Sequence, residues 1–187
     1  MIRNIAVVGL FLLLGACQTT GVEDKPTYTG SPDDEAAVLS LAQHVCVENL
    51  GDGEAMNAAA RNLTNDIEKR HTAKSGNHEI PVQSYRYTKD GKYLAYVSIL
   101  WGGEACSVNY AERLVRPSVF QSSFDVVMTG GIYEGAIYGK SQSRDMAMVV
   151  SKSRGEDGPV MSVGFMNKEA YRKEQSLTGA PDLGWGG

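Results

Sequence analysis

Apolar residues recur at intervals of three and four in two successive segments, a spacing typical of amphipathic helices. The first helix is predicted to begin at Ser31-Pro32-Asp33-Asp34, a cap residue followed by proline and acids, and to run to about Asn49. A second helix is predicted from about Glu54 to Lys69. Gly51-Asp52-Gly53 forms a connection so short that the two helices should pack antiparallel, as a helical hairpin.

After residue 78 the apolar period changes to two, which is typical of β-strands. Lys89-Asp90-Gly91-Lys92 separates the first two runs, and Asp-Gly is a strong signal for a hairpin turn. Residues 111–115 fit either a short strand or a loop. The predicted strands are Ile80–Thr88, Lys92–Leu100, Phe124–Thr129, Ile132–Tyr138, Met146–Ser153 and Val160–Met166.

Together these patterns predict a single α+β domain over residues 32–178. Its N-terminal helical hairpin is expected to pack on an antiparallel β-sheet of about 5–6 strands. A chain of 187 residues is long enough to bury a core of this kind. Residues 179–187 are rich in glycine and proline, and we expect them to form a flexible tail.

The N-terminal residues have a different character. Arg3 precedes an uncharged, mostly apolar run from Ile5 to Leu14. A helix that crosses a bilayer needs about 20 apolar residues, so this run is too short and fits the apolar region of an export signal. The run ends in Leu14-Gly15-Ala16-Cys17, which resembles the lipobox of bacterial lipoproteins.

This resemblance implies that residues 1–16 are a signal peptide and that Cys17 is diacylated, with palmitate-type chains. Two or more acyl chains hold a protein stably on a bilayer. Residues 17–31 would then form a lipidated tether. Gln18 after the cysteine resembles lipoproteins sorted to the outer membrane, so the expected location is the cell envelope, on the outer membrane facing the periplasm.

The charge balance narrows the class of partner. The chain has 18 basic and 22 acidic side chains and a formal net charge of −4. Nucleic acid is not an expected partner, because phosphate binding needs a basic face. We expect the chain to meet the membrane through its lipid anchor and to contact another envelope protein.

Apart from Cys17, the chain has two cysteines, Cys46 and Cys106. In an exported domain such a pair is most simply a disulfide, here joining the first helix to the loop after the first hairpin. Two alternatives stay open: a catalytic thiol at Cys106, which would need a histidine base, or two unrelated thiols.

No pattern predicts a metal site, a cofactor or a catalytic residue. His44 precedes Glu48 by four residues on the polar side of the first helix. His71 and His78 bracket the end of the second helix, but metal sites need three or four ligands. Glu104 and Glu134 are the best candidates for a catalytic acid, although surface positions in loops explain both more simply.

Aromatic residues gather in the first predicted hairpin and in a later strand. Tyr85 and Tyr87 should share one face of their strand, whereas Tyr93 and Tyr96 should point to opposite faces of theirs. These rings can simply stabilise the sheet as cross-strand pairs. If one sheet face is uncovered, they would form a binding surface. Its residues would be Tyr85, Tyr87, Trp101 and Tyr133.

The function that the sequence favours is that of a lipid-anchored cell-envelope protein acting through protein–protein contacts, as an assembly factor, a secretion accessory or a surface antigen. One alternative is a binding module for a small ligand or cell-wall glycan on the aromatic face. Another is a hydrolase of envelope polymers that uses Glu104 or Cys106.

Overall fold

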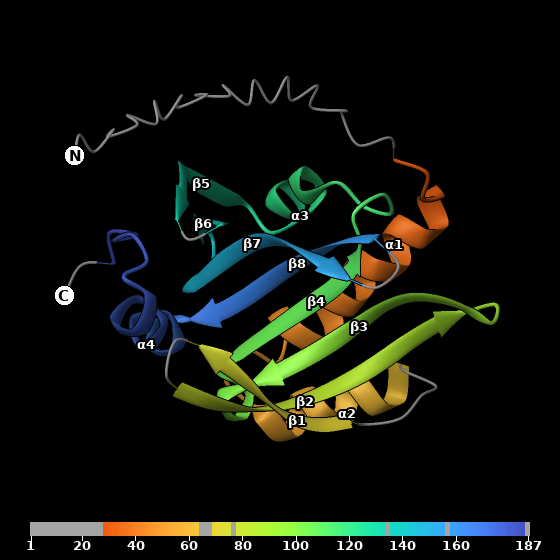
Figure 1. The fold of residues 1–187 in the computed structure, drawn as a ribbon, viewed down its shortest axis with the longest axis horizontal. Coiled ribbons are helices and arrows are strands. Elements are labelled where there is room, and N and C mark those ends of the chain that lie inside the picture. The colour runs from red at the N-terminus through yellow and green to blue at the C-terminus, as the bar shows by residue number, and fades with distance from the viewer. Residues whose placement is uncertain (1–27, 64–68, 76–77, 134, 156–157, 186–187) are drawn as a thin grey trace, which may run out of the picture.

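The computed structural model describes residues 28–63, 69–75, 78–133, 135–155 and 158–185. It has an α+β fold in which helices pack on an antiparallel sheet, as the sequence predicts (Figure 1). In the described residues the sheet has 8 strands, more than the expected five or six. The strands are β1 (Lys69–Ser75), β2 (His78–Lys89), β3 (Lys92–Leu100), β4 (Ala105–Ala111), β5 (Val126–Tyr133), β6 (Ala136–Ser141), β7 (Met146–Gly155) and β8 (Gly158–Asn167).

The sheet consists of two meanders joined at its centre. Its strand order is β1-β2-β3-β4-β8-β7-β6-β5, and every pair is antiparallel. The pairing of β4 with β8 is therefore the one contact between the two meanders within the described sheet, and β1 and β5 are its edges.

The first predicted helix is continuous but changes its geometry. It begins as α1 (Pro32–Leu41), where the Ser31 side chain accepts from the backbone N–H of Asp34 and the Asp34 carboxylate accepts from that of Ser31. It continues as the π-helical turn η1 (Ala42–Val47), and the Glu48 N–H donates to the Gln43 carbonyl five residues back. The wider turn buries residues 42 and 45–47 against the sheet.

The second helix, α2 (Gly53–Leu63), is shorter than predicted. Lys69 begins β1 instead of ending the helix. Three further elements were not predicted: β4, α3 (Pro117–Ser123) and α4 (Lys168–Thr178). The connection η2 (Trp101–Gly103) is a single 3₁₀ turn between β3 and β4.

The helices divide the sheet into two unlike faces. On β4 the side chains of Cys106, Val108 and Tyr110 point to one face, which we call the helical face. The α1, η1, α2 and α3 segments pack there, and Figure 1 shows α1 and α2 behind the strands. Ser107 and Asn109 point to the opposite face. Most of the buried core therefore lies between the helical face and the N-terminal helices.

The opposite face is covered at one end only. There Tyr138 and Ala147 of the sheet pack against Tyr171 of α4 and Ala180 beyond it. Trp185 lies edge-on to Tyr171 with 5.1 Å between ring centroids, so residues 180–185 lie on the sheet and not apart from it, as a flexible tail would. Figure 1 shows no described helix in front of β2, β3 and β4.

Candidate functional site

Cys17, the predicted lipidation site, and the predicted tether as far as residue 27 lie outside the described residues. The last residues of the predicted tether are already part of the domain. The N–H groups of Thr29 and Gly30 donate to the Arg113 carbonyl at 2.9 and 3.2 Å. A Cβ at Gly30 would lie 2.1 Å from the Leu114 carbonyl oxygen, so glycine is required for this close approach.

Cys46 and Cys106 form a disulfide with 5.3 Å between their Cα atoms. This confirms the predicted pairing, but the bond joins η1 to β4, because the loop expected around Cys106 is a strand. Both residues are buried in the core. A sulfur held in a disulfide offers no thiolate, so Cys106 does not act as a nucleophile in this form.

Two of the four residues expected to form an aromatic binding surface, Tyr85 and Tyr87, face the helices instead. Tyr85 is only 1% exposed, because its strand position faces the helices, and its hydroxyl donates to Asn57 Oδ1 at 2.6 Å. Tyr87 shares that face and packs against the core. Trp101 is half-buried at the start of η2. The side chain of Tyr133 lies outside the described part of the structure.

A β-bulge creates a different aromatic pair. The register between β2 and β3 shifts after Tyr87, where Thr88 pairs with Tyr93 and Arg86 pairs with Tyr96. Cross-strand partners share a face, so the extra residue brings Tyr93 and Tyr96 to the same face, contrary to the prediction. They are 38% and 37% exposed, and the Arg86 guanidinium lies 5.4 Å from the centroid of the Tyr93 ring.

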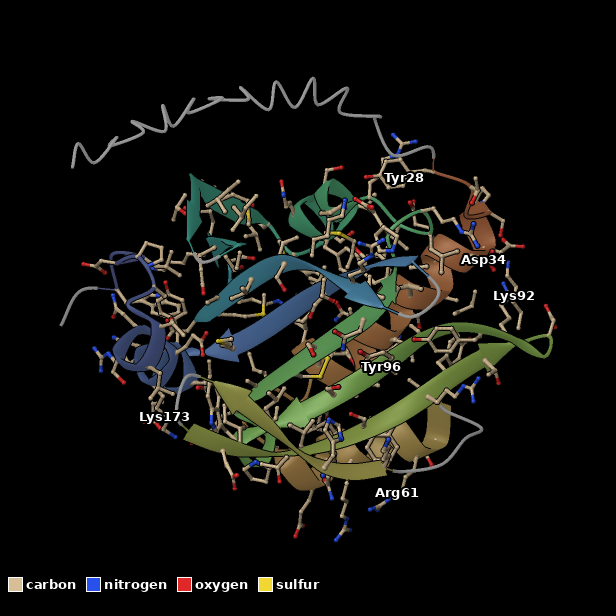
Figure 2. All side chains as sticks on the ribbon, viewed as in Figure 1. Tyr28, Asp34, Arg61, Lys92, Tyr96 and Lys173 are labelled. Atoms are coloured by element: carbon tan, nitrogen blue, oxygen red, sulfur yellow. A yellow bond between two sulfur atoms is a disulfide. The ribbon has the colours of Figure 1, made fainter. Side chains whose placement is uncertain are left out.

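Figure 2 shows Tyr96 on the uncovered face of the sheet, where it belongs to a row of polar side chains. The register places one polar side chain from each of β2, β3, β4, β8 and β7 side by side. We call this row the polar stripe; its residues are Arg86, Tyr96, Asn109, Ser162 and Ser151.

A second row of small residues lies next to the stripe. The Ser84 and Ser98 hydroxyl oxygens lie 3.0 Å apart, and Asn109 donates to Ser107 Oγ at 3.1 Å. Ser84, Ser98 and Asn109 are buried, and they form a low floor beside the larger, paired side chains of Arg86 and Tyr96. In the described strands, the residues that the register assigns to this face include no aspartate or glutamate.

The two edges of the sheet differ in chemistry. Along β1 the sequence is Lys-Arg-His-Thr-Ala-Lys-Ser, and such charge along an edge discourages pairing with another strand. Along β5 it is Val-Val-Met-Thr-Gly-Gly-Ile-Tyr, without a charge or a proline. Val127 is 59% exposed and Ile132 is 75% exposed. Charges and proline, two of the usual protections against strand addition, are therefore absent from β5, and its register with β6 is irregular between Met128 and Ile132.

A cleft of about 680 Å³ lies where α2 begins beside β1 and β2. Its lining carries both signs of charge, from Asp52 and Glu54 at the start of α2 and from Arg70 of β1, and it also includes His71. Asp52 Oδ1 already accepts from the backbone N–H groups of Glu54 and Ala55, so it serves as the cap of α2.

The remaining polar candidates have structural partners or lie apart. His44 Nδ1 lies 2.9 Å from Glu48 Oε2 on the helix surface, and His71 is exposed on β1. The Glu104 carboxylate pairs with the Lys173 ammonium of α4. The side chain of His78 and all of Glu134 lie outside the described residues. In the described part of the chain, no group of three His, Cys, Asp or Glu side chains could hold a metal ion.

Among the described residues, no helix is both long and apolar enough to cross a membrane. No family model, no curated protein and no solved structure matches this chain.

Proposed function

We propose that this chain is a lipid-anchored cell-envelope protein that acts by binding another protein, which adds an extended strand to the β5 edge. The lipobox resemblance at Leu14-Gly15-Ala16-Cys17 supports the anchor, and Gln18 after the cysteine supports the location on the outer membrane. The proposal that the contact is made at β5 rests on the difference between the two sheet edges, since β1 carries charged residues and β5 does not.

Strand addition suits β5 in two ways. Backbone N–H and C=O groups along an unpaired edge can hydrogen-bond to an incoming strand, and that supplies affinity without much sequence specificity. Val127 and Ile132 add exposed apolar area beside those groups. An edge of 8 residues buries less surface than a stable interface of about 1,200–2,000 Å² needs, so the partner must also contact neighbouring side chains.

Two matched edge positions test the contact in cells of the source organism. A photo-crosslinking amino acid at Ile132 should yield one defined adduct with an envelope protein, and the same probe at Thr72 on β1 should not. Val127→Lys should abolish the Ile132 adduct, because an edge lysine opposes strand pairing, whereas Thr72→Lys should leave it intact. Equal adducts from the two edges would rule out the β5 contact.

The anchor needs its own test. Cys17→Ser should prevent labelling by radioactive palmitate and release the protein from the membrane fraction. Retention of Cys17→Ser in the outer membrane would mean that something other than acyl chains holds the protein there.

A further inference from the structure

We propose that the polar stripe and its serine floor bind an acidic glycan that lies across the strands. The site is separate from the β5 edge, since it lies over β2, β3, β4, β8 and β7. The inference comes from three properties of this surface: its shape, its hydrogen-bonding groups and its charge.

The stripe has the shape of an extended binding track. Neighbouring strands lie about 4.8 Å apart, so five side chains in register span about 19 Å. The floor is low because Ser84, Ser98 and Asn109 are small and buried, and Tyr93 with Tyr96 rises at one end. A linear chain can lie along such a track, with a ring stacked on a tyrosine.

The hydrogen-bonding groups suit sugars. Serine hydroxyls both donate and accept, and the asparagine amide offers two donors and an acceptor. Sugar hydroxyl and acetamido groups offer the same mixture of hydrogen-bond donors and acceptors. A protein partner would instead be matched by an apolar interface centre, which the serines and Asn109 do not provide.

The charge on this face favours an acidic ligand. The chain as a whole is acidic, with a formal net charge of −4. The strand residues of this face nevertheless include no carboxylate in the described strands, and Arg86 sits at the end of the stripe. A guanidinium can bind a carboxylate through two parallel hydrogen bonds. The ligand we infer is therefore a glycan of N-acetylated sugars that bears carboxylates.

The source we assign is the glycan strand of the cell wall, and this assignment rests on the proposed envelope location. The chemistry of the ligand does not depend on that location. The probe is a set of peptide-free glycan strands, released from cell wall by an amidase so that their lactyl carboxylates are exposed. Binding is measured by calorimetry with the full chain in detergent micelles.

Neutral chitin oligomers share the N-acetylated backbone and lack the carboxylate, so they isolate the contribution of charge. We expect saturable binding of the glycan strands and about tenfold weaker binding of chitin oligomers, in line with the loss of one charge-assisted hydrogen bond. Arg86→Gln should reduce glycan affinity about tenfold and leave chitin affinity unchanged. Tyr96→Ala should weaken both ligands.

The control is Arg172→Gln, which removes an exposed cation on α4, an element that contributes no residue to the stripe. It should leave both affinities unchanged, and equal loss in Arg172→Gln and Arg86→Gln would overturn the site. Failure of the unaltered chain to bind glycan strands, or equally tight binding of polyglutamate, would overturn the glycan assignment. Thermal unfolding of each variant verifies its fold.

The glycan site and the β5 contact can be tested independently of each other. Val127→Lys should not alter glycan affinity, and Arg86→Gln should not alter the cross-link from Ile132. Loss of glycan binding in Val127→Lys would contradict a site confined to the stripe.

Discussion

The hydroxyl of Tyr85 donates to Asn57 Oδ1 at 2.6 Å, and this bond joins β2 to α2 inside the core. Asn57 in turn donates to the Gly53 carbonyl at 2.6 Å, so its amide is held on both sides. Tyr85→Phe removes the donor and leaves the Asn57 oxygen without it. We expect a loss of about 1–2 kcal/mol in the free energy of unfolding, measured by urea titration. Tyr96→Phe, at an exposed position, is the control and should change stability little.

The disulfide should contribute much of the stability. It closes a loop with a sequence separation of 60. The chain-entropy estimate for such a loop is about 4 kcal/mol, and typical total stabilities are about 5–15 kcal/mol. Cys46→Ala combined with Cys106→Ala should therefore lower the urea midpoint strongly. An unchanged midpoint would mean that the core packing, without the covalent bond, fixes η1 on β4.

Position 103 requires glycine for two reasons, its backbone conformation and the close packing around it. Its φ is +101°, and a Cβ there would lie 2.5 Å from the Gly53 Cα. Gly91 also has a positive φ, of +73°, but a Cβ there would meet nothing within 4 Å. Gly103→Ala should therefore cost more than the roughly 1 kcal/mol of backbone strain that we expect for Gly91→Ala. Comparable melting temperatures for the two variants would contradict this.

Alkaline pH should destabilise the protein. Burial raises the pKa of Tyr93 to about 12, the neighbouring Tyr96 adds to the shift, and Arg86 opposes it. Burial also raises the pKa of Tyr110 and of Tyr171. The folded state then holds these protons more tightly than the unfolded state. The contribution of these tyrosines to the free energy of unfolding is therefore fully present below pH 10 and is lost as the pH rises through 12.

The Tyr93→Phe variant isolates one of these tyrosines. In a titration followed by tyrosinate absorbance, the variant should lack a transition near pH 12 that the unaltered chain shows. Its stability should also fall less steeply above pH 10. Loss of a transition near pH 10 instead would mean that Tyr93 is as accessible as in an unfolded chain.

Trp185 should stabilise α4 locally. Its ring lies against Tyr171, and the Lys140 ammonium lies 5.6 Å from its centroid. Trp185→Ala removes a partly buried ring, whose contacts contribute about 1–2 kcal/mol to the stability of this region. Amide hydrogen exchange should then accelerate in α4 while β3 and β4 keep their protection. Arg172→Ala, at an exposed position of the same helix, is the control.

The sequence predicts well where local patterns are strong. The capping box at Ser31 and the Asp90-Gly91 turn are encoded by adjacent residues, and the structure contains both. The disulfide partners follow from the cysteine count together with the predicted export signal. The β4 strand also alternates, with Cys106, Val108 and Tyr110 on one side, and this alternation is the signal for a strand where we expected a loop.

The surface could not be predicted, because it depends on which face the helices cover. The alternation of β2 places Tyr85 and Tyr87 together, yet nothing local reveals that this face is the buried one. The bulge beside Thr88 is also set by tertiary pairing, and it moves Tyr93 to the face of Tyr96. The polar stripe needs the registers of β2, β3, β4, β8 and β7, which sequence spacing alone does not supply.

The strand order has a consequence for the order in which the two halves of the sheet can fold. Every pairing in the described sheet except that of β4 with β8 joins strands adjacent in sequence, so each meander can form through local contacts. The disulfide lies wholly within the first meander and its helices. If the chain is exported N-terminus first, as the proposed signal peptide requires, this half can therefore oxidise and fold while the rest is still crossing the membrane. The exposed edge of β4 then serves as the template on which β8 completes the sheet.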